Sequence, residues 1–99
     1  MFRIETTEPF EAWLAGLQDG MTRRRLLVRL KKASLGNLGD VAPVGDGVSE
    51  MREHFGAGWR LYYIQQGEVL IVMLGGGTKA TQSRDIEKAR AQARLFRKE

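Results

Sequence analysis

Charged and titratable side chains recur at every second position in two neighbouring stretches of this 99-residue chain. In residues 48–55 the alternating set is Glu50, Arg52 and His54, and a little further on it is Arg60 and Tyr62. Alternate side chains of a β-strand share a face, so two adjacent strands would bring these five groups together. Arginine suits a phosphodiester because a guanidinium chelates two phosphate oxygens, and an imidazole, a carboxylate or a phenol could move a proton.

Two further groups extend this candidate site. Lys79 follows a triglycine and could reach the same surface, where it would supply a point charge. Trp59 and Tyr62 offer aromatic faces on which an unpaired RNA base could stack. A solvated strand face shows the same alternation of charges, and a lone histidine is often incidental, so the pattern by itself leaves this plainer interpretation open.

The composition excludes several classes of chemistry. The chain has no cysteine, which excludes disulfides, thiol nucleophiles and cysteine-bound metal sites, and its one histidine excludes a two-histidine acid–base pair. No cluster has metal-ligand spacing, so we expect neither a metal nor an organic cofactor. The longest apolar run, Val69–Leu74, is too short to cross a membrane, and the first residues lack a signal-peptide pattern. We therefore expect a cytoplasmic protein.

The net charge of +4 is ordinary, but the basic residues are clustered. Residues 21–40 and residues 81–99 each contain six of the 16 lysines and arginines. Both stretches contain an apolar periodicity typical of helices, from about residue 21 to 34 and from residue 81 to 98. This layout favours an anionic partner more than the total charge does.

The pattern of the whole chain predicts one α+β domain over residues 1–99, with the element order β-αα-βββ-α. Residues 2–6 alternate as a short strand. Thr7 is a plausible cap for a helix that ends at Asp19-Gly20, and the basic second helix completes a helical hairpin. We interpret the glycine-rich residues 36–47 as a structured loop.

Three strands should follow as an antiparallel meander, at residues 48–55, 58–66 and 68–74. The third is apolar on both faces and should be central in the sheet, ending at the triglycine of residues 75–77. We expect the helices to pack on one face of this small, mainly antiparallel sheet. The opposite face, which carries the candidate site, would then be only partly covered.

Two stretches of the chain resemble the RelE/ParE toxin superfamily: GNLGD-x-x-PVGDGVSEMREHFGAGWRLYY at residues 36–63 and LGGGTKATQSRDIEKA at residues 74–89. More narrowly, they resemble the HigB-like "addiction module killer protein" group. The resemblance covers nearly the whole chain, including FEAWLAGLQD and the basic second helix. It implies a RelE/ParE-like fold and the toxin of a type II toxin–antitoxin pair, whose cognate antitoxin is usually a small helix-turn-helix protein.

The resemblance leaves more than one activity open. Members on the RelE and HigB side cut messenger RNA in the ribosomal A site, whereas members on the ParE side poison DNA gyrase. We expect a metal-independent endoribonuclease that acts with the ribosome and messenger RNA. A ParE-like gyrase inhibitor and an inactive nucleic-acid-binding module are the alternatives. In the favoured case the basic second helix would dock on ribosomal RNA through Arg24, Arg25, Lys31 and Lys32.

The resemblance also implies roles for individual residues. Arg52 matches the arginine of an E-x-R strand, Arg60 the arginine that follows a strand aromatic, and Lys79 the lysine of a GG-x-K turn. These are the cations that strand alternation had selected. His54 is the candidate general base or acid, with Glu50 as an alternative base. The best-known RelE enzymes also use a tyrosine near the C-terminus, and the last helix of this chain has none, which leaves the base open.

Overall fold

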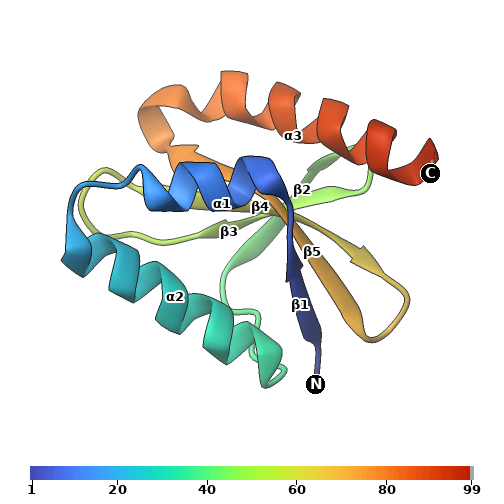
Figure 1. Cartoon of the computed structure of the whole chain (residues 1–99), viewed down its shortest axis with the longest axis horizontal. Coiled ribbons are helices and arrows are strands. Elements are labelled where there is room, and N and C mark those ends of the chain that lie inside the picture. The colour runs from blue at the N-terminus through green and yellow to red at the C-terminus, as the bar shows by residue number, and fades with distance from the viewer. Residues whose placement is uncertain (99) are drawn as a thin grey trace.

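The computed structural model describes residues 1–98 of the chain. It is an α+β domain in which five strands form one sheet, with three α-helices around it (Figure 1). The elements follow one another as β1 (Arg3–Thr6), α1 (Glu8–Ala15), α2 (Gly20–Ser34), β2 (Val41–Gly45), β3 (Val48–Arg52), β4 (Trp59–Gln66), β5 (Leu70–Thr78), a 3-10 turn (Lys79–Thr81) and α3 (Gln82–Lys98). Within the described residues, no helix is long and apolar enough to cross a membrane.

The sheet is mixed. Its strand order is β1-β5-β4-β3-β2. Only the β1–β5 pair is parallel, and the other neighbours are antiparallel. The predicted mainly antiparallel sheet is therefore confirmed, with β4 at its centre and β5 between β1 and β4.

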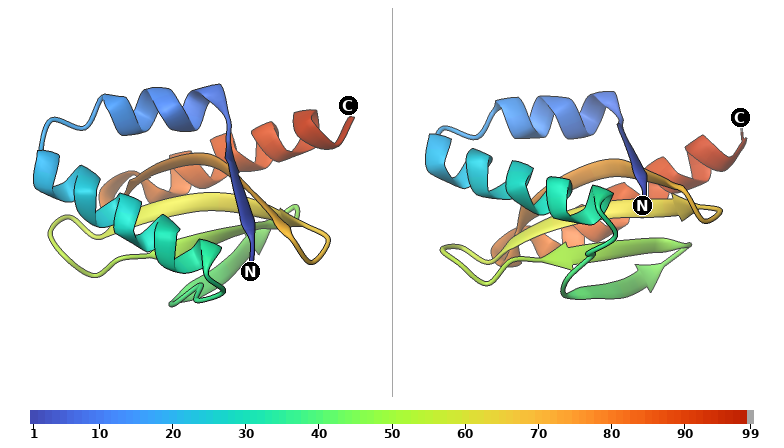
Figure 2. Two further views of the ribbon diagram at one scale, coloured as in Figure 1. Left: turned by 60° about the horizontal axis from the view of Figure 1, so that its bottom comes forward. Right: turned by 90° about the horizontal axis from the view of Figure 1, so that it is seen from below.

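Side-chain caps start the first two helices, as the sequence indicates for Thr7. Its Oγ1 accepts the N–H of Phe10 at 3.4 Å, and a proline occupies the first turn of α1. At the second helix, the carboxylate of Asp19 accepts the N–H of Met21 at 3.1 Å. These caps confine the break between α1 and α2 to a few residues, so the two helices form the hairpin that lies above the sheet in the right view of Figure 2.

Helices cover both faces of the sheet, so the expectation of helices on one face is wrong. On one side α1 and α2 contribute Phe10 and Leu26 to a core cluster that includes Leu61 of β4. On the other side Ala93 of α3 belongs to a second cluster that includes Val72 of β5. The physical reason is that β3, β4 and β5 are apolar on both faces over much of their length, and the apolar stripe of α3 buries the second face.

The sheet also has one strand more than predicted. Part of the expected loop of residues 36–47 is the strand β2, which pairs with β3 in the register Val41↔Met51. Its Pro43 is compatible with pairing because β2 lies at the edge of the sheet. The sequence did not indicate the short β2–β3 pairing, because the glycines of the turn between these strands are also typical of a loop.

The triglycine does not end the last strand, as had been expected, but continues it. Gly75 pairs with Tyr62 and Gly77 with Arg60. Glycine is needed here because other groups approach the backbone closely. A Cβ at Gly76 would lie 2.4 Å from the Trp13 ring of α1, and the space on the opposite face of β5 is similarly occupied by a carboxylate of α3.

Candidate functional site

The strand register places the alternating residues as predicted. Glu50 lies opposite Tyr62, and Arg52 lies opposite Arg60. The two core clusters confirm the predicted sheet faces. Tyr62 belongs to the cluster beneath α3, whereas its neighbour Leu61 belongs to the cluster beneath α1 and α2. The sheet therefore brings the predicted carboxylate, phenol and two guanidinium groups onto one face.

The middle of that face is closed, which corrects the expectation of an open surface. Only 3% of Glu50, 6% of Arg60 and none of Tyr62 is exposed. At the start of α3, the side-chain amide of Gln82 donates hydrogen bonds to both carboxylate oxygens of Glu50, at 2.9 and 3.2 Å. The Tyr62 ring, predicted to stack on a base, therefore presents no free face in this structure.

Arg60 is buried without an ionic partner. Its Nη1 donates to the Trp59 carbonyl at 3.2 Å, while its Nε has no hydrogen-bond partner in the described part of the chain. No carboxylate oxygen in residues 1–98 lies within 4.0 Å of its nitrogens. A buried guanidinium without a counter-ion is unfavourable, because desolvation is not offset by pairing. An anion bound beside Arg60 would supply the missing partner.

The hydroxyl of Tyr62 is another buried group that finds no hydrogen-bond partner among residues 1–98. Burial raises the pKa of Tyr62 well above its ordinary value, so the phenol stays protonated at neutral pH. A protonated phenol can donate to an anion. Unpartnered buried polar atoms are rare in folded proteins, and two in one region mark it as a candidate ligand site.

Two more cations lie near Arg60 at the same end of the sheet. Arg52 is its cross-strand neighbour. Lys79 is held next to the β3–β4 turn by its N–H, which donates to the Ala57 carbonyl at 3.4 Å. Gly58 lies between the two groups, since a Cβ there would be 3.2 Å from the Lys79 Cβ and 3.7 Å from the Arg60 Nη1. The three predicted cations are thus gathered around one turn.

His54 forms a pair that the sequence did not reveal. Asp40, just before β2, accepts from Nε2 of His54 at 2.7 Å and from Nη2 of Arg52 at 2.8 Å. The hydrogen bond from Arg52, and then that from His54, lower the pKa of Asp40 to about 2. An ionised carboxylate can only accept, so Nε2 carries the hydrogen. When neutral, the imidazole then has its lone pair on Nδ1, and the side chain is well exposed.

Arg29 of α2 holds the backbone around this pair in place through hydrogen bonds. It is buried, and its guanidinium donates to the carbonyl oxygens of Leu38, Asp40 and Arg52, each at 2.9 Å. It also forms an ion pair with Glu53. The basic second helix was expected to present its cations to RNA, and Arg29 is instead buried. The missing signal is the β2–β3 pairing, which puts Asp40 beside Arg52.

Four other basic residues of α2 are exposed, as predicted, whereas Arg23 is half-buried. Arg24, Arg25 and Lys32 border a cleft of about 330 Å³, where the carboxylate of Glu53 also lies. The guanidinium of Arg25 stacks 3.8 Å from the centre of the Phe55 ring. The four predicted RNA-docking residues lie on this exposed side of the helix: Arg24, Arg25, Lys31 and Lys32.

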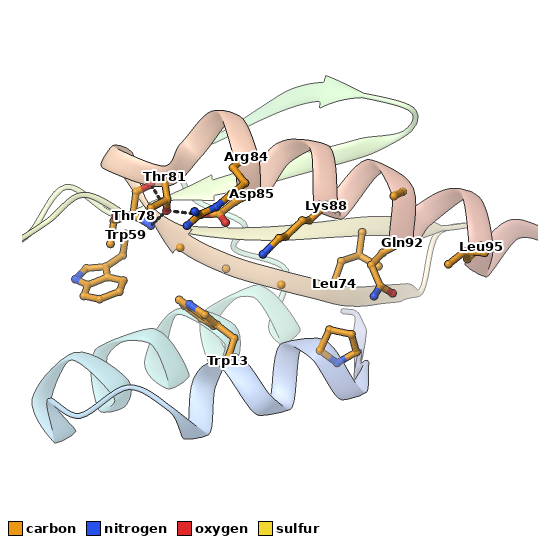
Figure 3. Close-up of a pocket in the computed structure, with 16 residues that line it drawn as sticks. Trp13, Trp59, Leu74, Thr78, Thr81, Arg84, Asp85, Lys88, Gln92 and Leu95 are labelled. Carbon is orange, nitrogen blue, oxygen red and sulfur yellow. Dashed lines mark hydrogen bonds between the residues drawn. The ribbon is translucent and has the colours of Figure 1, made fainter.

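A larger cleft, of about 630 Å³, runs between α1 and α3 along β5 (Figure 3). Its lining includes Trp13 and Trp59, whose ring centres are 6.3 Å apart. Trp59 is therefore the predicted stacking residue that borders open space. Arg84 and Lys88 of α3 lie on the opposite side of the cleft from Trp13. Across residues 1–98, no group of three or more histidine, aspartate and glutamate side chains is placed to hold a metal ion.

Comparison with other proteins shows one relationship clearly. No family model matches the chain. The sequence is 38% identical over 91 residues to an uncharacterized protein of Haemophilus influenzae strain Rd, and the match covers 92% of each chain. Identity at this level over nearly the full length of both chains implies a shared fold. The chain therefore belongs to the same family as that uncharacterized protein of Haemophilus influenzae.

Proposed function

We propose that this protein is the toxin of a type II toxin–antitoxin pair, of the HigB-like group in the RelE/ParE superfamily, and that it cuts messenger RNA on the ribosome. The observation that carries the proposal is the buried Arg60, which has no counter-ion among the described residues. Its cross-strand neighbour Arg52 shares the carboxylate of Asp40 with His54, which orients the imidazole. A phosphodiester has the charge and geometry that a guanidinium binds best. The His54–Asp40 pair can take a proton from a sugar hydroxyl.

The proposed reaction is attack of an RNA 2′-hydroxyl on the neighbouring phosphorus. The proton of the hydroxyl passes to Nδ1 of His54, the new P–O bond closes a 2′,3′-cyclic phosphate, and the bond to the 5′ oxygen breaks. Arg60 and Arg52 stabilise the added negative charge on the phosphorane. Lys79 donates a proton to the leaving 5′ oxygen, or holds a neighbouring phosphate while water supplies that proton, and the 5′ oxygen leaves as a hydroxyl group. Glu50 is enclosed by α3, so His54 is the base in this scheme.

The substrate would enter near the N-terminal end of α3, where α3 no longer covers the sheet. The side chain of Arg52 is partly exposed, and those of His54 and Lys79 are exposed. A flexible single strand suits this position, because Trp59 borders the adjoining cleft and offers a surface for an unstacked base. The partners in this proposal are the ribosome, the messenger RNA and a helix-turn-helix antitoxin, and the reaction takes place in the cytoplasm. The exposed cations of α2 would dock on ribosomal RNA in a salt-dependent way.

Induced expression without an antitoxin tests the proposal. Wild type should arrest growth, whereas Arg60→Ala should not, because loss of one such charge donor slows a reaction by about 10²–10³. Arg52→Ala should weaken the arrest in the same direction. Arg3→Ala, which removes an exposed arginine of β1, is the matched control and should stay toxic. Full toxicity of both Arg60→Ala and Arg52→Ala would show that the site is assigned wrongly.

The gyrase-inhibitor alternative gives a different response in the same experiment. DNA-damage signalling and stalled gyrase complexes after induction would indicate it, while truncated messages would indicate the nuclease. Absence of any toxicity in the wild type would instead support an inactive nucleic-acid-binding module.

A further inference from the structure

Strand β5 has an unpaired edge. β1 pairs with it only over Leu70–Met73, because β1 ends at Thr6 and the chain then turns into α1. Leu74 is skipped by an irregularity in the β4–β5 register, and from Gly75 to Thr78 the strand is paired with β4 alone. The backbone N–H and C=O of Thr78 are partnered by the hydroxyl of Thr81. Among residues 1–98, nothing adds a strand beside the three glycines between them.

This open edge forms the back of the large cleft, between α1 and α3 (Figure 3). The ring of Trp13 packs on Gly76 from one side, where a Cβ would come within 2.4 Å of it. The carboxylate of Asp85 packs on Gly77 from the other side, where a Cβ would be 1.9 Å away. The two contacts leave the edge itself uncovered. Alternate residues of a strand direct their backbone groups to opposite edges, so at least one glycine presents its N–H and C=O to the cleft.

The side chains around the edge indicate what would occupy it. The apolar part includes Pro9, Leu74 and Leu95, and Leu95 is 64% exposed. The charged part includes Arg84 and Lys88, both exposed and neither in an ion pair with any residue from 1 to 98. An occupant must therefore offer backbone hydrogen bonds, apolar side chains and negative charge.

We propose that an extended, acidic polypeptide segment of a partner protein binds in this cleft and adds a strand to the open edge of β5. Its backbone would pair with the triglycine stretch, while alternate side chains lie against Trp13 on one side and α3 on the other. Its carboxylates would pair with Arg84 and Lys88. The proposal does not depend on the catalytic assignment, since Trp13, the triglycine, Arg84 and Lys88 take no part in the proposed reaction. Trp59, the proposed base-stacking residue, lines the same cleft but is not needed for strand addition.

A set of synthetic peptides of about ten residues tests this inference, because strand addition uses the backbone amides of alternate residues only. The probe alternates valine or threonine with glutamate and carries a fluorophore, and its binding to the full chain is followed by fluorescence anisotropy. Two further versions are N-methylated, one at the odd and one at the even residues. One of these should bind like the parent peptide, and the other should lose binding. Replacement of the glutamates by lysine should also abolish binding.

Charge-reversal variants locate the site. The double variant Arg84→Glu/Lys88→Glu should weaken peptide binding by about tenfold, because two partly exposed ion pairs are replaced by repulsion. The matched control Lys31→Glu/Lys32→Glu reverses two exposed cations of α2 and should change the affinity by less than about twofold. A circular dichroism spectrum and a urea midpoint measured for each variant confirm that it is folded.

Three outcomes would overturn the inference. The first is no binding of the acidic peptide up to about 1 mM. The second is equal binding of both N-methylated versions, since strand addition cannot tolerate methylation of the residues that face β5. The third is binding of a short single-stranded RNA that is lost in Arg84→Glu/Lys88→Glu and is not displaced by the acidic peptide. That result would assign the cleft to nucleic acid.

Discussion

Replacement of the buried Arg60 by methionine should make the protein more stable while it removes the proposed anion site. The side chain is 6% exposed; within residues 1–98 its Nε has no partner, and its one hydrogen bond is to the Trp59 carbonyl. That carbonyl also accepts the N–H of Glu53 at 2.9 Å, so it stays satisfied after the substitution. An unsatisfied buried polar group costs about 1–3 kcal/mol, and loss of one ordinary hydrogen bond costs about 1 kcal/mol.

The expected net effect of Arg60→Met is therefore an increase of about 1 kcal/mol in the free energy of unfolding. Urea denaturation followed by tryptophan fluorescence measures it, and with an ordinary slope the midpoint should rise by about 1 M. Inorganic phosphate should stabilise the wild type at constant ionic strength but leave Arg60→Met unchanged, because only the wild type has the site. Arg24→Met, at an exposed position of α2, is the control and should stay within about 0.5 kcal/mol of wild type. A less stable Arg60→Met protein, or equal stabilisation of both proteins by phosphate, would refute the reasoning.

Three other predictions concern the glycines of β5, the Arg52–Asp40 ion pair and the contacts of Asp46 with α3. Gly76→Ala should lower the free energy of unfolding by about 1–3 kcal/mol, because its Cβ would meet the ring of α1, whereas Gly75→Ala has free space and should have little effect in urea titrations. Arg52→Gln should raise the pKa of Asp40 from about 2 toward its ordinary value, as followed by carbon NMR of the carboxyl group. Since that pKa is lowered in the folded protein, the contacts of Asp40 are kept above its unfolded pKa and lost as the pH falls toward 2. Asp46→Asn should reduce the urea midpoint slightly, more at low salt than at high salt, because this carboxylate accepts from two arginines of α3.

The sequence predicted the helices and the faces of the central strands well, because each depends on local periodicity. The apolar stripe of α3 packs on the sheet as its spacing indicates, with Ala93 buried and Ile86 partly buried. The alternation in β3 and β4 put Glu50, Arg52 and their partners on the correct face. A strand fixes the face of a side chain by parity alone, so this inference needs no knowledge of the tertiary structure.

The covering of that face could not be predicted in the same way. Which side of the sheet α3 occupies depends on the total of apolar contacts that each side offers, and this is a property of the assembled fold. Tyr62 was expected at an open surface and is buried beneath α3. Strand β2 was missed for a related reason, since a short edge strand with a proline and glycines has a weak local signal.

The His54–Asp40 pair could not be predicted from the sequence. It depends on the pairing of β2 with β3, and the residues of β2 were interpreted as part of a loop. Once residues 41–45 are paired with β3, Asp40 falls beside Arg52, and the carboxylate can reach both side chains. The role of Arg29 was hidden by its neighbours, because a helix with many cations suggests a solvated face. Its burial follows from its position on the side of α2 that also carries Leu26 and Leu30.

The most direct test of the proposed activity is to map the 5′ ends of cellular messenger RNA shortly after induction. The proposed reaction predicts new ends with a 5′-hydroxyl, upstream fragments with a 2′,3′-cyclic phosphate, and cleavage positions in register with codons. Arg60→Ala, expressed at the same level, should produce none of them. Growth arrest by the wild type with intact messages, or the same ends in the Arg60→Ala strain, would contradict the assignment of a ribosome-dependent endoribonuclease with Arg60 at its centre.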